Sequence, residues 1–233
     1  MDKKNELIYA EKIFNNKIYK NIMAIYRTII PFGDVVDTNI NEIINDFMRR
    51  KHDEFLNEIL TDRNIISTFD VEDVEFIMNF KKTLDAVNRL SNNDKVKYFA
   101  RLLKNSYMNT TRVLNDEYEE MLRILGDMSY REINYLLFLY KFEQEHDITK
   151  DDYWYSFMTA FEKQFEINRY KSYEIYKRLE NTGLICEELI LESKTVTEPS
   201  NSEEYNELLT DRLDLKYFYT TDLLKKMVNL ISK

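Results

Sequence analysis

Glycine and proline are scarce in this sequence. The 233 residues include 3 Gly and 2 Pro, whereas ordinary usage of about 7% and 5% predicts roughly 16 and 12. Sandwiches and barrels need many tight turns, which depend on these residue types. Gly33, Gly126 and Gly183 also lie far apart, which excludes a glycine-rich phosphate-binding loop. The shortage therefore predicts a protein built from long helices.

Cysteine and long apolar runs are scarce as well. Cys186 is the single cysteine and cannot form an internal disulfide, which suits a reducing compartment. The segment 1–12, MDKKNELIYAEK, is charged throughout and lacks the apolar core of a signal peptide. The longest apolar runs, 22–30 and 133–140, are interrupted by polar residues and are too short to cross a bilayer. We therefore expect a cytoplasmic protein with no membrane partner.

Acidic residues outnumber basic ones. The chain has 42 Asp and Glu against 33 Lys and Arg, a net charge of −9 at pH 7. Such a balance repels nucleic-acid phosphates and anionic lipid unless basic groups gather on one face. Hydrophobic residues make up 44% of the chain and aromatic residues 14%, enough for a folded core. The composition thus predicts a globular protein whose contact with DNA would require a local basic surface.

Apolar residues recur at helical spacing as far as residue 182. We expect Pro31 and Gly33 to end the first helix and Gly126 the fifth, since Pro clashes with the preceding turn and Gly frees the backbone. Gly183 follows the eighth helix, where a left-handed cap is wanted. The expected apolar stripes are Phe14–Ile29, Ile44–Ile59, Val74–Val87, Val96–Leu103, Tyr118–Leu125, Ile133–Tyr140 and Trp154–Phe165, followed by a helix over 169–182.

Three sites have the pattern of a helix start. Ser91–Asp94 and Ser129–Glu132 fit the capping box, in which a hydroxyl and a carboxylate satisfy exposed backbone amides. We expect the fourth helix to begin at the first box and the sixth helix at the second. Thr149 is expected to cap the seventh helix, which carries the aromatic stripe.

The pattern changes after Gly183. Residues 184–191 and 195–197 are rich in strand formers, and a later segment alternates as a half-buried strand does. Pro199 lies between them in a segment that we expect to be a mobile loop. The apolar set of the later strand is Leu213, Leu215, Tyr217 and Tyr219, and a terminal helix is predicted from Leu224, Met227, Val228 and Ile231.

The predicted elements divide into two modules, in a fold that is mainly α. Residues 1–127 are expected to form an antiparallel helical bundle. Residues 128–233 run helix, helix, helix, hairpin, helix, the order expected of a winged-helix-like module with a small β-hairpin. In that fold the helix before the hairpin is the recognition helix.

The winged-helix order poses the question of DNA binding. On the helix before the hairpin, Arg169, Lys171, Lys177 and Arg178 are the candidate phosphate contacts. The segment 184–215, however, carries nine acidic residues and two basic ones, a net charge of −7. A wing of that charge meets the DNA backbone with like charge. We therefore expect binding to another protein or to itself, which the 17 Tyr suit; a winged-helix DNA-binding transcriptional regulator is the alternative.

Three places in the sequence suggest metal-dependent chemistry. His52-Asp53 and His146-Asp147 resemble the His-Asp pair of metal phosphohydrolases, but two histidines are too few for such a site. We expect His52 at the edge of the core, because it lies on an apolar stripe, and His146 in a solvated loop. Glu192 and Lys194 follow a strand as in a metal-dependent nuclease, which also needs a preceding strand ending in Asp. This nuclease is the second alternative; we expect no catalytic residue, metal or cofactor.

Three segments together carry a family pattern: DKVKYFARLLKNSY (94–107), EYEEMLRILGDMSYREINYLLFLY (117–140) and YKRLENTGLI (176–185). They resemble the Abi-alpha type of phage abortive-infection protein. The matching positions are Phe99, Ala100, Leu102, Leu103, Asn105, Ser129, Glu132, Leu179, Gly183, Leu184 and Ile185. The resemblance implies a role in conflict between bacterium and phage and carries no catalytic residues. Taken together, the sequence predicts a non-enzymatic, cytoplasmic interaction protein in phage defence or mobile-element biology.

Overall fold

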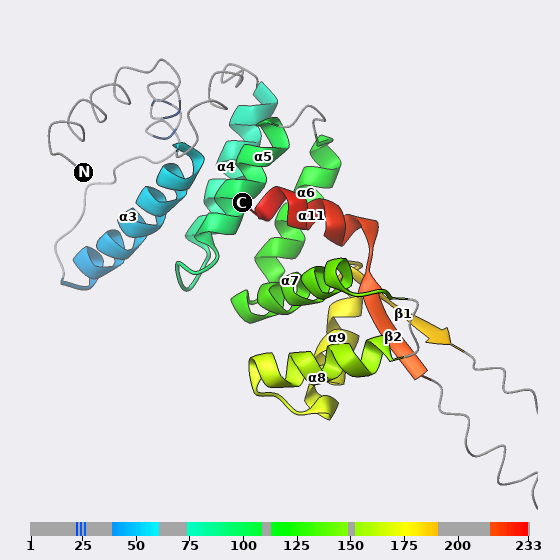
Figure 1. The fold of residues 1–233 in the computed structure, drawn as a ribbon. Coiled ribbons are helices and arrows are strands. Elements are labelled where there is room, and N and C mark those ends of the chain that lie inside the picture. Colours follow the sequence, from blue (N-terminus) through cyan, green and yellow to red (C-terminus); the bar gives the residue numbers. More distant parts are fainter. Residues whose placement is uncertain are drawn as a thin grey trace, which may run out of the picture. The chain divides into compact units, whose positions relative to one another are not determined.

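The computed structural model describes residues 22, 24, 26, 39–60, 74–108, 113–148, 152–190 and 215–232. This part of the chain contains eight helices and one two-stranded antiparallel sheet, so the mainly helical prediction is confirmed (Figure 1). The chain forms two compact units, the first from Met1–Tyr130 with Met227–Lys233 and the second from Arg131–Lys226. The predicted division at residue 127 differs in placing the C-terminal residues with the second module.

Several predicted features lie outside the described residues. These are Pro31 and Gly33, Thr149, the strand over 195–197, the loop around Pro199, and Leu213. Of the predicted first helix, the structure describes only Ile22, Ala24 and Tyr26, which are helical.

Four helices of the first unit follow one another: α3 (Asn39–Leu60), α4 (Val74–Asn88), α5 (Val96–Met108) and α6 (Asn115–Asp127). α5 packs against α3, α4 and α6. The fully buried side chains include Phe55, Ile59, Phe80, Leu84, Val87, Phe99, Leu103 and Leu125, so the helical stripes place the core correctly. At the start of α4 the stripe shifts, because Phe76 is buried whereas Val74 is 72% exposed.

The predicted helix starts meet different outcomes. α5 begins at Val96, later than the box at Ser91–Asp94 predicts, because residues 91–95 form turns in which the Val96 N–H donates to the Asn93 carbonyl at 2.9 Å. α7 (Tyr130–Glu145) begins directly after Ser129, as predicted. α8 (Tyr153–Phe165) is preceded at its cap position by Asp152, whose side chain makes no capping hydrogen bond.

The second unit contains α7 from Arg131 onward, α8, α9 (Arg169–Glu180), β1 (Ile185–Ile190), β2 (Leu215–Thr220) and the first half of α11 (Asp222–Ile231). Its core is a cluster of aromatic rings in edge, tilted and stacked contacts, which confirms the aromatic stripe of α8 as core. The rings are those of Tyr135, Phe138, Phe142, Trp154, Phe157, Phe161, Phe165, Tyr173, Tyr176 and Phe218.

The two-stranded sheet lies beside α9, with β1 in contact with that helix, as Figure 1 shows. Gly183 has φ +74°, a left-handed conformation that glycine adopts without strain, and it separates α9 from β1 as predicted. The strands are antiparallel, with Ile185 opposite Thr220. The predicted inner face of β2 is wrong at its described end, because Phe218 and Thr220 are buried and Tyr219 is half-exposed. The Phe218 ring contacts the rings of Trp154, Tyr173 and Tyr176, and these contacts select the face.

The predicted terminal helix is present as α11, and Leu224, Met227, Val228 and Ile231 are all buried. Among the described helices, none combines the length and the apolar character needed to cross a bilayer.

Candidate functional site

The four predicted phosphate contacts all lie on α9 with exposed side chains. The opposite face of α9 carries Ser172, Ile175, Tyr176 and Leu179, which are buried in the second unit. The helix begins after Asn168, whose side-chain oxygen accepts the backbone N–H of Lys171 at 3.0 Å. All four predicted residues are therefore exposed, but at 3.6 residues per turn they are spread over about 200° of the helix surface.

Two of these cations are paired with carboxylates of neighbouring helices. Arg178 Nη2 lies 2.7 Å from Glu132 Oε1 of α7. Arg169 Nε lies 3.1 Å from Glu162 Oε1 of α8. These carboxylates come from other helices, and the helical spacing of α9 alone could not have indicated them.

Lys177 is held between two carboxylates. Its Nζ lies 2.7 Å from Glu180 Oε2 and 2.7 Å from Glu187 Oε2 of β1. The hydrogen bonds that it donates to Glu180 and Glu187 raise the pKa of Lys177, so it remains a cation at any physiological pH. The Tyr173 hydroxyl also donates to Glu187 at 2.9 Å. Glu187 thus ties α9 to β1 and pairs with a cation in the last turn of the helix.

The charge balance of this surface follows from these pairs. The four cations share the surface with five carboxylates, those of Glu132, Glu162, Glu174, Glu180 and Glu187. Nonspecific DNA binding requires cations that are available to neutralise phosphates. Within the described part of the chain, only Lys171 of the four predicted contacts has no carboxylate partner. Three of the four predicted phosphate contacts are therefore already paired with the chain's own carboxylates.

Exposed aromatic side chains flank the same face. Tyr155 is 64% exposed and Tyr170 is 86% exposed. The guanidinium of Arg169 stacks over the Tyr155 ring at 5.0 Å, so Tyr155 and Glu162 together hold the arginine in place. The helical stripe could have indicated Tyr155, since it follows Trp154 and points about 100° away from the buried face. Tyrosine and arginine are the residue types enriched at the energetic centres of protein interfaces.

The two histidines occupy structural positions. His52 is 6% exposed; its Nε2 lies 2.6 Å from Asn88 Oδ1 and its Nδ1 lies 2.8 Å from the Tyr26 hydroxyl. A neutral ring with its proton on Nε2 satisfies both contacts, so the core position is confirmed. His146 is exposed just beyond α7, stacks on the Phe142 ring at 3.8 Å and donates from Nδ1 to the Phe142 carbonyl.

The nuclease candidates Glu192 and Lys194 lie outside the described residues. The element before β1 is the helix α9, so the described chain offers no preceding strand to supply an Asp. Among the described residues, no three His, Cys, Asp or Glu side chains are grouped as a metal ion would require.

Glu143 is a polar residue of the second unit that the sequence pattern does not single out. Its carboxylate accepts the Thr220 N–H at 2.7 Å and also the Thr220 hydroxyl, and thereby fastens the end of β2 to α7. Burial raises the pKa of Glu143, although the Thr220 hydrogen bonds and Lys225 oppose the shift. The nearby Tyr153 hydroxyl is buried without a hydrogen-bond partner among the described residues. The arrangement anchors β2 to α7.

The positions that carry the family resemblance are also structural. Phe99, Ala100, Leu102 and Leu103 are fully buried in α5. Asn105 donates from Nδ2 to the Leu230 carbonyl at 2.6 Å and so holds the end of α11. These side chains pack the core or satisfy a helix end.

Comparison with known proteins adds no family assignment. No protein-family model, curated protein or solved structure matches this chain. The resemblance to abortive-infection proteins therefore stays a prediction. The proposal for function rests on the geometry of α9 and its neighbours.

Proposed function

We propose that this chain is a non-enzymatic interaction protein that acts by binding another protein through its second unit. The observation that supports this most is the pairing of charges on α9, where the chain's own carboxylates form ion pairs with Arg169, Lys177 and Arg178. A protein partner tolerates such a mixed surface, because electrostatic complementarity in protein interfaces involves both signs.

We further propose that the second unit is a winged-helix-like module. Its support is the order of elements, with three helices followed by an antiparallel strand pair and a final helix. α9 then stands where the recognition helix of DNA-binding members lies. The acidic residues from 184 to 215 and the paired cations of α9 favour a protein ligand for the same surface.

The partner-binding residues follow from exposure and chemistry. Tyr155, Arg169 and Tyr170 offer two aromatic rings and an oriented guanidinium at one end of α9. The double substitution Y155A/Y170A should lower recovery of the partner in a quantitative affinity purification from the native cell by tenfold or more, because such anchors are each worth about 1–2 kcal/mol or more.

The matched control is K141A/K163A. Lys141 and Lys163 are exposed helix positions of the same unit and lie on α7 and α8 rather than on α9. Their truncation removes exposed side chains without touching the two tyrosines, so recovery should stay at the wild-type level. Equal recovery by the tyrosine variant and wild type would contradict the proposed surface.

The DNA-binding regulator is tested on the same helix. Reversing the charge of Arg169, Lys171, Lys177 and Arg178 together should abolish DNA binding if α9 enters a groove of the duplex. Under the proposed function, wild type shows no micromolar binding in a gel shift at low salt, and the reversal changes nothing. Tight binding by wild type that the reversal removes would replace this proposal with the regulator.

The proposed setting is conflict between bacterium and phage. Its support is the resemblance carried by segments 94–107, 117–140 and 176–185. The protein is expressed in a susceptible bacterium, which is then challenged with a panel of phages. Expression should lower the plating efficiency of at least one phage if the protein serves the host. If the protein serves the phage, expression should raise the plating efficiency of a phage that another defence system restricts. The Y155A/Y170A variant should lose that effect. No change for any phage, together with a partner that is unrelated to phage growth, would contradict the setting but not the binding surface.

A further inference from the structure

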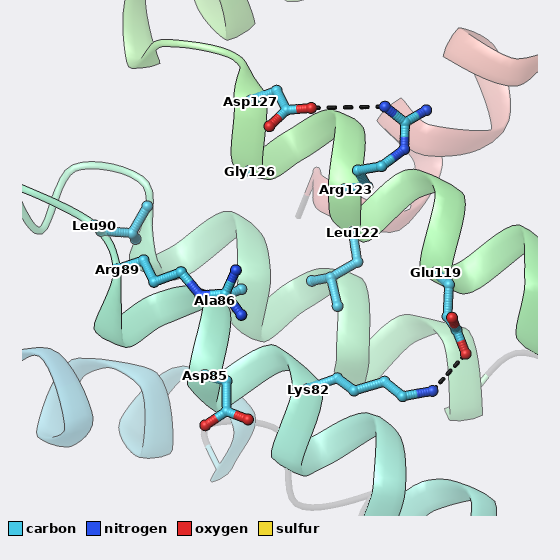
Figure 2. Close-up of a pocket in the computed structure, with 10 residues that line it drawn as sticks. All are labelled: Lys82, Asp85, Ala86, Arg89, Leu90, Glu119, Leu122, Arg123, Gly126 and Asp127. Atoms are coloured by element: carbon cyan, nitrogen blue, oxygen red, sulfur yellow. Dashed lines mark hydrogen bonds and ion pairs between the residues drawn. The ribbon is translucent and has the colours of Figure 1, made fainter.

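A groove of about 380 Å³ lies between α4 and α6 of the first unit. Figure 2 shows charged side chains along both of its sides, with Leu122 between them. The apolar part of the lining is small and consists of Ala86, Leu90 and Leu122. The charged part consists of Lys82, Asp85 and Arg89 from the α4 side and Glu119, Arg123 and Asp127 from α6.

The charges alternate along each side. The α4 row reads positive, negative, positive, and the α6 row reads negative, positive, negative. The spacing of three or four residues keeps each row on one helix face. The two rows are therefore complementary along their whole length, whether they are placed parallel or antiparallel.

Inside one chain the rows are only partly paired. Lys82 reaches across the groove to Glu119. Arg123 pairs at 3.6 Å with Asp127 of its own helix, where both side chains are about 70% exposed and such a pair is weak. Asp85 and Arg89 form no ion pair with any described residue. The middle and last residues of the α4 row, Asp85 and Arg89, can therefore form ion pairs with another molecule.

We propose that this surface, defined as the α4 row and the α6 row, binds a second copy of the chain. The α4 row of one copy faces the α6 row of the other, and the two-fold symmetry of such a contact repeats each pair. A partner surface of a single sign would meet repulsion from half of the charges, whereas a second copy carries the complementary pattern. The six charges also sum to zero, so this surface adds no net repulsion between two copies that each carry a net charge of −9.

Asp85 and Arg123 provide the sharpest test, because they are the middle members of their rows. They meet across the interface in either relative direction of the helices. The substitutions D85K and R123E each place two pairs of like charges in the dimer and should weaken it about tenfold, as measured by sedimentation velocity over a range of concentrations. Wild type should dimerise at micromolar concentration, and added NaCl should weaken the dimer.

Mixing the two variants distinguishes this contact from a general charge effect. In a dimer of one D85K chain and one R123E chain, the two introduced side chains face each other at one contact, with opposite charges. At the other contact Asp85 faces Arg123, as in wild type. The mixture should therefore recover the wild-type dimerisation constant, and the double variant D85K/R123E should recover it alone. The controls E120K and R131E change exposed residues outside the groove by the same charge and should leave dimerisation unchanged.

A monomeric wild type at all concentrations would overturn the proposal and leave the groove to another occupant. Singles that dimerise as wild type does, or a mixture that fails to recover, would overturn it equally. Circular dichroism checks that each variant is folded. The proposal is independent of the proposed function, because its residues lie in the first unit and partner binding is tested on Tyr155 and Tyr170 of the second.

Discussion

At the scale of single residues, carboxylates pair with three of the four cations of α9. Glu187 illustrates this: its side chain is 11% exposed and accepts from both Lys177 and Tyr173. A charge-assisted pair of this kind occupies the ammonium group that a phosphate would need. The location of Arg169, Lys177 and Arg178 on one helix could be predicted from spacing. Their partners could not, because Glu132, Glu162 and Glu187 reach α9 only through the tertiary fold.

Glu143 yields a prediction with a defined pH dependence. Burial raises its pKa in the folded chain above the ordinary value of 4.5. Because the folded state then takes up a proton at higher pH than the unfolded state, the contribution of Glu143 to stability rises as pH falls from 7 and becomes constant below its ordinary pKa. The substitution E143Q removes this dependence and keeps an acceptor for the Thr220 N–H.

Denaturant unfolding at pH 7 and pH 5 measures the effect. The stability of E143Q relative to wild type should be higher at pH 7 than at pH 5. E143A should cost about 1–3 kcal/mol more than E143Q at both pH values, because it also leaves the Thr220 N–H without an acceptor. A relative stability of E143Q that is the same at both pH values would contradict the account.

At the scale of secondary-structure elements, the shortage of glycine changes how helices end. Lys95 is 5% exposed, and its Nζ donates to the carbonyls of Gly126 and Met128 at the end of α6. Arg101 and Asn105 do the same for the Ile231 and Leu230 carbonyls of α11. Lys51 donates to the Leu90 carbonyl just beyond α4. Side chains from neighbouring helices thus satisfy carbonyls that a glycine cap often satisfies elsewhere.

Substitution of Lys95 tests this role. K95M keeps the apolar stem and removes the ammonium, so two carbonyls lose their donor and the C-terminus of α6 loses a favourable charge. We expect a loss of about 2–3 kcal/mol in the free energy of unfolding, measured by urea denaturation. K81M makes the same change at an exposed position of α4 and should stay within about 0.5 kcal/mol. Equal effects of the two substitutions would show that Lys95 does not stabilise the helix end.

Element prediction succeeded where local pattern decides and failed where packing decides. The stripes of Phe55 and Phe99 and the left-handed Gly183 follow from spacing and backbone geometry. The inner face of β2 was misassigned because both of its faces carry aromatic residues, and contact with the Trp154 ring then selects Phe218. The capping pattern predicts too early a start for α5, because residues 91–95 form turns before the helix begins. The same residue pattern fits such turns.

At the scale of the whole molecule, charge is distributed unevenly along the chain. The net charge of −9 is uneven: the segment 184–215 carries −7, whereas the α4 and α6 rows of the first unit sum to zero. The grouping of Met227–Lys233 with the first unit could not be read from element order, because it depends on contacts with α5 that are distant in sequence. The scarcity of glycine and proline predicts the helical class, and the positions of the carboxylates are the basis of the proposed protein partner.

The most direct test of the central claim is the salt dependence of duplex-DNA binding, measured by fluorescence anisotropy. Wild type is compared with E132Q/E162Q/E180Q/E187Q, which frees Arg169, Lys177 and Arg178. The control D46N/D53N/D116N/E120Q neutralises four exposed carboxylates of the first unit. We expect no micromolar binding by wild type or by the control. The glutamine variant should bind, and the logarithm of its association constant should fall with the logarithm of the salt concentration with the slope expected for about three phosphate-neutralising cations. Micromolar, steeply salt-dependent binding by wild type, unchanged in the glutamine variant, would contradict the account.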